Sequence, residues 1–247
     1  ESDPEYIIDL VNQGAISETR IDESVRRILR NKFDLGLFET PFADEAKVNA
    51  LVNLPEYVSL GMTAQRNAVV LLDNESITLP LAAETRIFVD GLDPSVAAKY
   101  GTVVETPDEA DVVLLFLNTV FNGNQPAGTD RTLDQMMASR FPDTNLAFSE
   151  EILAKAASYS DVSQLVTLVD LNRPAVLTEL NGMSDALVGT FGVSDEAMLD
   201  VVFGKHNPVG KLPFELPSSM AEVEAQLEDV PDDTANPLFP YGWGLSY

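Results

Sequence analysis

The sequence contains no cysteine, so a disulfide framework, a catalytic thiol and a cysteine-based metal site are all excluded. Basic residues are also scarce: 15 Lys and Arg stand against 40 Asp and Glu, for a formal net charge of −25. A surface of this sign repels phosphate backbones and anionic lipid heads. No apolar run reaches the about 18 residues that a membrane-spanning helix needs. Nucleic acid and membranes are therefore not expected as partners.

The motifs of nucleotide enzymes and serine hydrolases are missing as well. No Gly-x-Gly-x-x-Gly turn, Gly-x-x-x-x-Gly-Lys-Ser/Thr loop or Gly-x-Ser-x-Gly elbow follows a predicted strand. The single histidine, His206, has no orienting partner visible in the sequence, which favours a structural role. We expect no cofactor and no metal, and the missing phosphate loop disfavours a generic flavodoxin-like ligand domain.

A chain of 247 residues, 45% of them apolar, is long enough to bury one substantial core with a small appendage. It begins at Glu1 without Met and without a signal-peptide pattern, which predicts a processed chain or an excised fragment.

Short helices are predicted at the N-terminal end. Asp3 and Pro4 favour the start of one helix, and Asp22 is a plausible N-cap for a second, which ends at Gly36. The second helix carries an apolar stripe of Val25, Ile28, Leu29 and Phe33. Residues 37–55 resemble a linker, and a helix over 56–67 opens the main domain. The predicted division is thus 1–55 and 56–247.

Beyond residue 67, short apolar runs alternate with helical patterns. Strands are predicted over 68–72, 86–89, 102–104, 111–117, 165–171 and 186–191. Residues 112–117 are apolar throughout, as strands covered on both faces require. The sequence therefore predicts an α/β fold: a three-layer αβα sandwich with a mostly parallel, flavodoxin-like sheet, preceded by short linker helices.

A polar loop of about thirty residues, 118–147, follows the strongest strand, whereas such connections usually run about 2–6 residues. Ligands of open parallel sheets bind outside the carboxyl ends of the strands, where this loop begins. Amide, carboxylate and guanidinium groups suit sugar hydroxyls, and the loop offers Asn122, Asn124, Gln125, Asp130 and Arg131. A surface insertion with ordinary turn chemistry at 122–124 is the alternative.

Several strings together resemble a known family. They lie at 20–38, 67–74, 79–81, 172–177, 203–214 and 236–247. In this order, and over nearly the whole chain, they resemble the C-terminal α/β sandwich of glycoside hydrolase family 3, with the helices that follow the catalytic barrel. The resemblance assigns 1–55 to the end of the barrel region and 56–247 to the sandwich domain.

The resemblance implies a retaining β-glycosidase of the β-glucosidase or β-xylosidase class, which hydrolyses terminal β-D-glycosidic bonds with two carboxyl groups. The family's nucleophile is an Asp of the preceding barrel, so this chain alone is expected to be inactive. The implied partners are a β-glucoside or oligosaccharide and the N-terminal barrel of the same polypeptide. Family membership also implies a periplasmic or extracellular location.

The acid/base of many members is a Glu on the loop that leaves the strand at 111–117, but residues 118–149 contain no Glu. Gln125 has the expected spacing, and an amide cannot deliver the proton. Asp130 is the nearest carboxylate and the first candidate, with Asn122, Asn124, Gln125 and Arg131 as candidate substrate ligands. Two alternatives stay open: Asp130 pairs with Arg131 or caps a turn, and the chain is a non-catalytic carbohydrate-binding or interaction module.

Overall fold

The computed structural model describes residues 3–119, 145–227 and 229–247. The chain divides into two compact units, Glu1–Val58 and Ser59–Tyr247. The assignment of 1–55 to a barrel region and of 56–247 to a sandwich domain stays a prediction.

The N-terminal unit is helical. It contains α1 (Pro4–Asn12), α2 (Glu18–Asp34), α3 (Glu45–Leu51) and the start of α4 (Pro55–Asn67). Asp3 caps α1 as predicted, since its carboxylate accepts a hydrogen bond of 3.0 Å from the Glu5 N–H. The prediction that Asp22 caps the second helix is wrong. Ser17 Oγ accepts from the Arg20 N–H at 3.2 Å, so α2 begins about two turns before the first residue of its apolar stripe.

The C-terminal unit is built on a mostly parallel sheet. Within the described residues its six strands are β1 (Val70–Asp73), β2 (Arg86–Asp90), β3 (Thr102–Val103), β4 (Val112–Asn118), β5 (Gln164–Asp170) and β6 (Ala186–Thr190). Their order is β1-β6-β5-β4-β2-β3, and β1 alone pairs antiparallel, with β6. The predicted α/β sandwich is confirmed.

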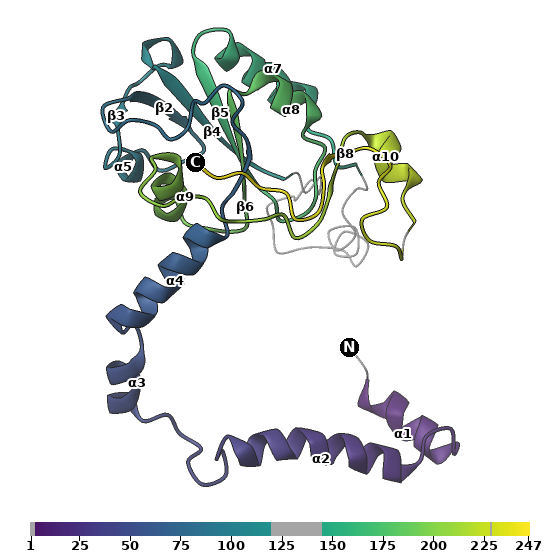
Figure 1. The fold of residues 1–247 in the computed structure, drawn as a ribbon. Coiled ribbons are helices and arrows are strands. Elements are labelled where there is room, and N and C mark those ends of the chain that lie inside the picture. The colour runs from purple at the N-terminus through teal and green to yellow at the C-terminus, as the bar shows by residue number, and fades with distance from the viewer. Residues whose placement is uncertain (1–2, 120–144, 228) are drawn as a thin grey trace, which may run out of the picture. The chain divides into compact units, whose positions relative to one another are not determined.

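Helices cover both faces of this sheet (Figure 1). Helices α5 (Pro94–Ala97) and α9 (Asp195–Val202) contribute to one buried cluster, and α7 (Glu150–Ser160) and α8 (Thr178–Met183) contribute to the other. Strand β4 contributes side chains to both clusters, since Leu114 belongs to the first and Leu115 to the second. Alternate side chains of one strand therefore enter two cores, which is why its sequence is apolar throughout.

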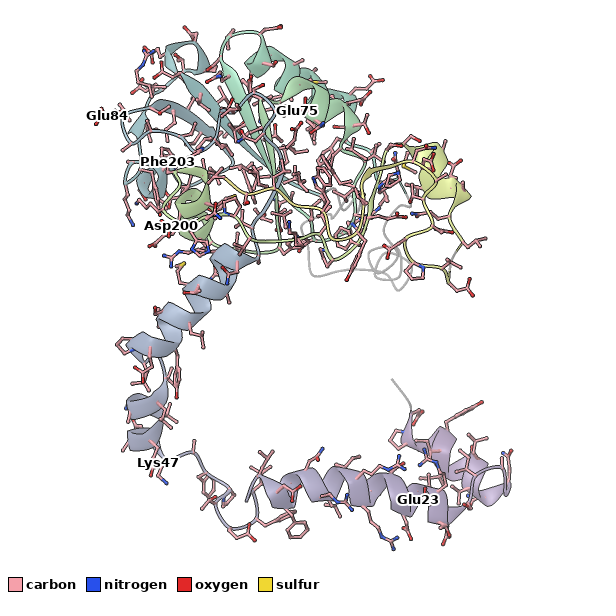
Figure 2. The ribbon with its side chains drawn as sticks, in the orientation of Figure 1. Glu23, Lys47, Glu75, Glu84, Asp200 and Phe203 are labelled. Atoms are coloured by element: carbon pink, nitrogen blue, oxygen red, sulfur yellow. The ribbon has the colours of Figure 1, made fainter. Side chains whose placement is uncertain are left out.

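A buried carboxylate lies on α9, where Figure 2 labels Asp200 near Phe203. Asp200 is 6% exposed and accepts from Arg66 Nε at 2.6 Å and from the Tyr100 hydroxyl at 2.7 Å. Burial, and then this hydrogen bond, raise the pKa of Tyr100. A buried carboxylate needs such partners, so the network joins the end of α4 to α9.

The chain closes with a small sheet and a tail. Strands β7 (Leu216–Pro217) and β8 (Pro237–Phe239) pair antiparallel, and α10 (Met220–Ala225) lies between them in sequence. The tail then runs along β1, because the Leu245 N–H donates to the Leu71 carbonyl at 2.8 Å. A Cβ on Gly244 would overlap the carbonyl oxygen of Gly210. Glycine at position 244 therefore lets the backbone of the tail lie close to the backbone at Gly210.

Candidate functional site

The carboxyl ends of four parallel strands form one edge of the sheet. The register pairs Asn118 of β4 with Asp170 of β5, and Asp170 with Thr190 of β6. Asp90 ends β2 beside Leu115 of β4. Polar side chains thus end four neighbouring apolar strands, and this edge is where parallel sheets bind ligands.

Asp170 holds the centre of this edge together. Its side chain is 6% exposed and accepts hydrogen bonds from the Gly192 N–H at 2.6 Å, Asn172 Nδ2 at 2.7 Å and Thr190 Oγ1 at 3.2 Å. Its backbone carbonyl accepts from the Thr119 N–H at 3.1 Å. A carboxylate with this many donors is well compensated for its burial. It fixes the ends of β4, β5 and β6 relative to one another.

Thr119, the residue after β4, carries an unsatisfied group. The residue is 3% exposed, and its hydroxyl has no hydrogen-bond partner among residues 3–119, 145–227 and 229–247. A buried hydroxyl without a partner costs about 1–3 kcal/mol. The first residue of the long loop is therefore held by its backbone and by packing, not by its hydroxyl.

Asp90 is paired with the neighbouring helix. Lys155 Nζ of α7 lies 2.5 Å from its carboxylate, and the Tyr159 hydroxyl donates to the same oxygen at 2.9 Å. Burial, and then the hydrogen bond to Asp90, raise the pKa of Tyr159 to about 12. Tyr159 is consequently a neutral donor at physiological pH, and this end of the edge is tied to α7.

The long loop returns to the same edge. The Val176 N–H donates to the Leu146 carbonyl at 3.0 Å, and Ala147 forms a parallel bridge with Val176. Arg173 Nη2 donates to the carbonyl of Asn145 at 3.2 Å. Both described ends of the loop thus lie beside the end of β5, which agrees with its predicted departure from the carboxyl edge.

The five predicted site residues, Asn122, Asn124, Gln125, Asp130 and Arg131, lie outside the described residues. Their roles stay predictions, because the described residues do not include any of the five.

Two carboxylates of the edge, Asp90 and Asp170, were missed by the sequence reasoning. The available signal was a single charged residue ending an apolar strand: Asp170 follows five residues whose side chains are fully buried, 165–169. The strand predicted over 165–171 instead included Asp170 as an ordinary member.

His206 has a structural partner, because its Nε2 lies 2.8 Å from Asn67 Oδ1. Trp243 is 37% exposed but is held at two points. Its indole N–H donates to the Leu72 carbonyl at 2.8 Å, and its ring lies 5.9 Å from that of Phe239.

In the part of the chain that the structure describes, no group of three or more acidic or histidine side chains is arranged to hold a metal ion. No helix there combines the length and the apolar character needed to span a bilayer.

An α/β domain with a long loop at its carboxyl edge defines a broad class of ligand-binding proteins. The family profile "Glycosyl hydrolase family 3 C-terminal domain" matches residues 96–247, more than half of the chain. The chain therefore belongs to glycosyl hydrolase family 3, and the predicted resemblance is confirmed.

Several curated relatives align with the whole chain. Beta-glucosidase C of Emericella nidulans is 43% identical over 252 residues, which cover 100% of this chain and 39% of the relative. The periplasmic beta-glucosidase/beta-xylosidase of Dickeya chrysanthemi is 36% identical and covers 100% of this chain, which spans 37% of the relative. The chain thus spans about two fifths of the length of these curated relatives.

Solved structures agree on the fold. The beta-glucosidase of Listeria innocua in complex with isofagomine superposes with a TM-score of 0.72 at 23% identity, over 98% of this chain and 41% of that one. The exo-1,3/1,4-beta-glucanase of a Pseudoalteromonas species gives a TM-score of 0.73 at 23% identity, over 98% of this chain and 35% of that one.

Proposed function

We propose that this chain is the C-terminal part of a retaining β-glycosidase of the β-glucosidase or β-xylosidase class. In this proposal it completes a pocket for a terminal β-D-glycoside together with a preceding barrel domain. The observation that carries the proposal is the alignment of the whole chain with Beta-glucosidase C, of which it spans only 39%.

The exposed apolar side chains of the N-terminal unit support a missing partner domain. On α2, Val25 is 44% exposed, Ile28 58% and Phe33 58%. No residue of α1, α2 or α3 is buried. Apolar surface of this extent is normally covered, and the proposed cover is the barrel of the same polypeptide.

The proposed chemistry uses two carboxyl groups, one as nucleophile and one as acid and then base. The barrel supplies the nucleophile, so the chain alone does not hydrolyse glycosides. Asp130 acts as the acid/base, and Asn122, Asn124, Gln125 and Arg131 bind sugar hydroxyls. The rigid edge around Asp170 supports this arrangement, since it fixes the residue from which the loop departs.

A second candidate is a non-catalytic carbohydrate-binding or interaction module. The observation that favours it is the lack of any Glu in 118–149, where many members of the family carry the acid/base. A periplasmic or extracellular location is part of the first proposal. Its support is that relatives from Dickeya chrysanthemi and Salmonella typhimurium are named periplasmic.

The test is hydrolysis of p-nitrophenyl β-glucoside and β-xyloside by this chain and by the polypeptide that the complete gene encodes. Activity is expected only in the longer polypeptide. Asp130→Asn should lower its kcat by about a hundredfold or more, the contribution typical of a general acid. Gln125→Glu is the matched variant, since it places a carboxyl group where the family spacing expects one. Turnover by the 247-residue chain alone would overturn the proposal, and a longer polypeptide that is inactive would favour the binding module.

A further inference from the structure

A cavity with a volume of about 400 Å³ lies beside the small sheet, next to β7, α10 and the segment that follows α10. Of the eleven described residues that line it, eight are apolar, among them Phe214 and Val223. Leu146, near the C-terminal end of the long loop, and Pro174, which follows β5, also line it, so the cavity adjoins the carboxyl edge of the main sheet. Its volume falls in the range of about 300–1,000 Å³ typical of small-molecule sites.

Glu215 lines this cavity, and its carboxylate is held in place through one oxygen. Its side chain is only 7% exposed. Its Oε1 atom accepts from the Thr234 N–H at 2.7 Å and from Gln226 Nε2 at 3.3 Å. Among the described residues no hydrogen bond reaches its other oxygen, Oε2. A buried carboxylate that is held through one oxygen keeps the second as a preorganised acceptor.

Among the described lining residues, the other two polar side chains, Gln226 and Asp232, also offer acceptor oxygens. Gln226 uses its Nε2 on Glu215 and on Thr234 Oγ1, at 2.6 Å, which leaves its carbonyl oxygen as an acceptor. Asp232 contributes a second carboxylate. Two carboxylates and an amide oxygen repel anions and favour a ligand rich in hydrogen-bond donors. Because most of the wall is apolar, that ligand also needs an apolar face.

We propose that this cavity is a sugar-binding site, which holds one neutral pyranose unit. The sugar hydroxyls donate to Glu215 Oε2 and Asp232, and the C–H face of the ring packs on the wall that contains Phe214 and Val223. A metal ion is disfavoured as the ligand, because most of the wall is apolar and offers it no donor atoms. An anion is disfavoured because the two carboxylates would repel it. The proposal goes beyond the hydrolytic function, because binding here needs neither a nucleophile nor an acid/base.

The experiment uses the polypeptide that the complete gene encodes, with saturating isofagomine present to occupy a glucosidase pocket. Methyl 1-thio-β-D-glucopyranoside, which is not readily hydrolysed, is the probe, and its binding is measured by saturation-transfer NMR and calorimetry. Glu215→Gln keeps an oxygen for the Thr234 N–H and replaces the free acceptor with a donor. Val223→Phe fills the cavity. Glu224→Gln is the control, since it removes the same charge from an exposed position of α10.

The parent and Glu224→Gln should bind the thioglucoside equally. Glu215→Gln should bind about tenfold more weakly or worse, the effect expected when a hydrogen bond to a charged group is lost. Val223→Phe should abolish binding while it keeps the parent's unfolding midpoint. The proposal is overturned if the parent does not bind, if both cavity variants bind like the parent, or if benzylamine binds more tightly than the sugar. Hydrolysis is assayed separately, so a failure of the proposed enzymatic function leaves this result interpretable.

Discussion

The two units of the chain use apolar side chains in opposite ways. In Glu1–Val58 the helices have apolar stripes, and Phe42 is 88% exposed, Leu35 72% and Tyr6 69%. In Ser59–Tyr247 the apolar residues of the sheet form two buried clusters, one on each face. An amphipathic pattern therefore specifies a helix without specifying what covers it. The first unit has the local signals of a folded protein, and the second also has a core.

The largest expected effect sharpens this contrast directly. Leu168 of β5 is fully buried, and Leu168→Ala should lower the free energy of unfolding of the 247-residue chain by about 2–5 kcal/mol. Ile28 of α2 is 58% exposed, and Ile28→Ala should change it by less than about 0.5 kcal/mol. Urea unfolding followed by circular dichroism measures both.

The same pair of substitutions tests the proposed barrel partner. In the polypeptide encoded by the complete gene, Ile28→Ala should lower the free energy of unfolding substantially, because the barrel is expected to bury that side chain. Equal costs for Ile28→Ala in the two polypeptides would contradict a barrel cover over α2. A large cost in the shorter chain would show that the N-terminal unit has a core of its own.

The next effect concerns the polar edge of the C-terminal unit. Asp170→Ala removes an acceptor from the Gly192 N–H and from the side chains of Thr190 and Asn172. Since each buried donor left unsatisfied costs about 1–3 kcal/mol and Asn172 can turn to water, the expected loss is about 2–4 kcal/mol.

Asp161→Ala is the matched control for this variant. Asp161 follows α7, and its side chain is exposed, so its replacement should cost less than about 0.5 kcal/mol. Similar midpoints for the two variants in urea would mean that Asp170 does not hold the strand ends together.

Apolar patterning accounted for most of the C-terminal unit. The strand predicted over 111–117 is observed as β4 (Val112–Asn118), and the helix predicted over 56–67 as α4 (Pro55–Asn67). Burial on both faces leaves a plain trace in a sequence, an unbroken apolar run. The direction of β1 leaves none, because an edge strand has the same composition whether it pairs parallel or antiparallel to its neighbour.

The polar edge was harder to predict, because its contacts join residues far apart in the chain. The hydrogen bond between Asp170 and the Gly192 N–H joins residues 22 positions apart in the sequence. The one between Asp90 and the Tyr159 hydroxyl joins residues 69 positions apart. The position of Glu215 in the sequence does not predict its contacts with Thr234 and Gln226, because only the fold brings these residues together. A sequence indicates which residue types could bind sugar, but register and loop closure decide which of them meet.

The smallest expected effect is a pH dependence that should distinguish the two units. Below pH 10 the neutral Tyr159 donates to Asp90, so Tyr159→Phe should cost about 1 kcal/mol. The pKa of Tyr159 is raised to about 12 in the folded chain from about 10 when unfolded, so its contribution is lost as the pH rises through this window. The stability gap between parent and variant should therefore shrink from pH 10 to 12 in urea unfolding series. Tyr6→Phe, at an exposed position of α1, should leave the parent's pH profile unchanged. A constant gap for Tyr159→Phe would mean that Asp90 and Tyr159 do not interact as the structure describes.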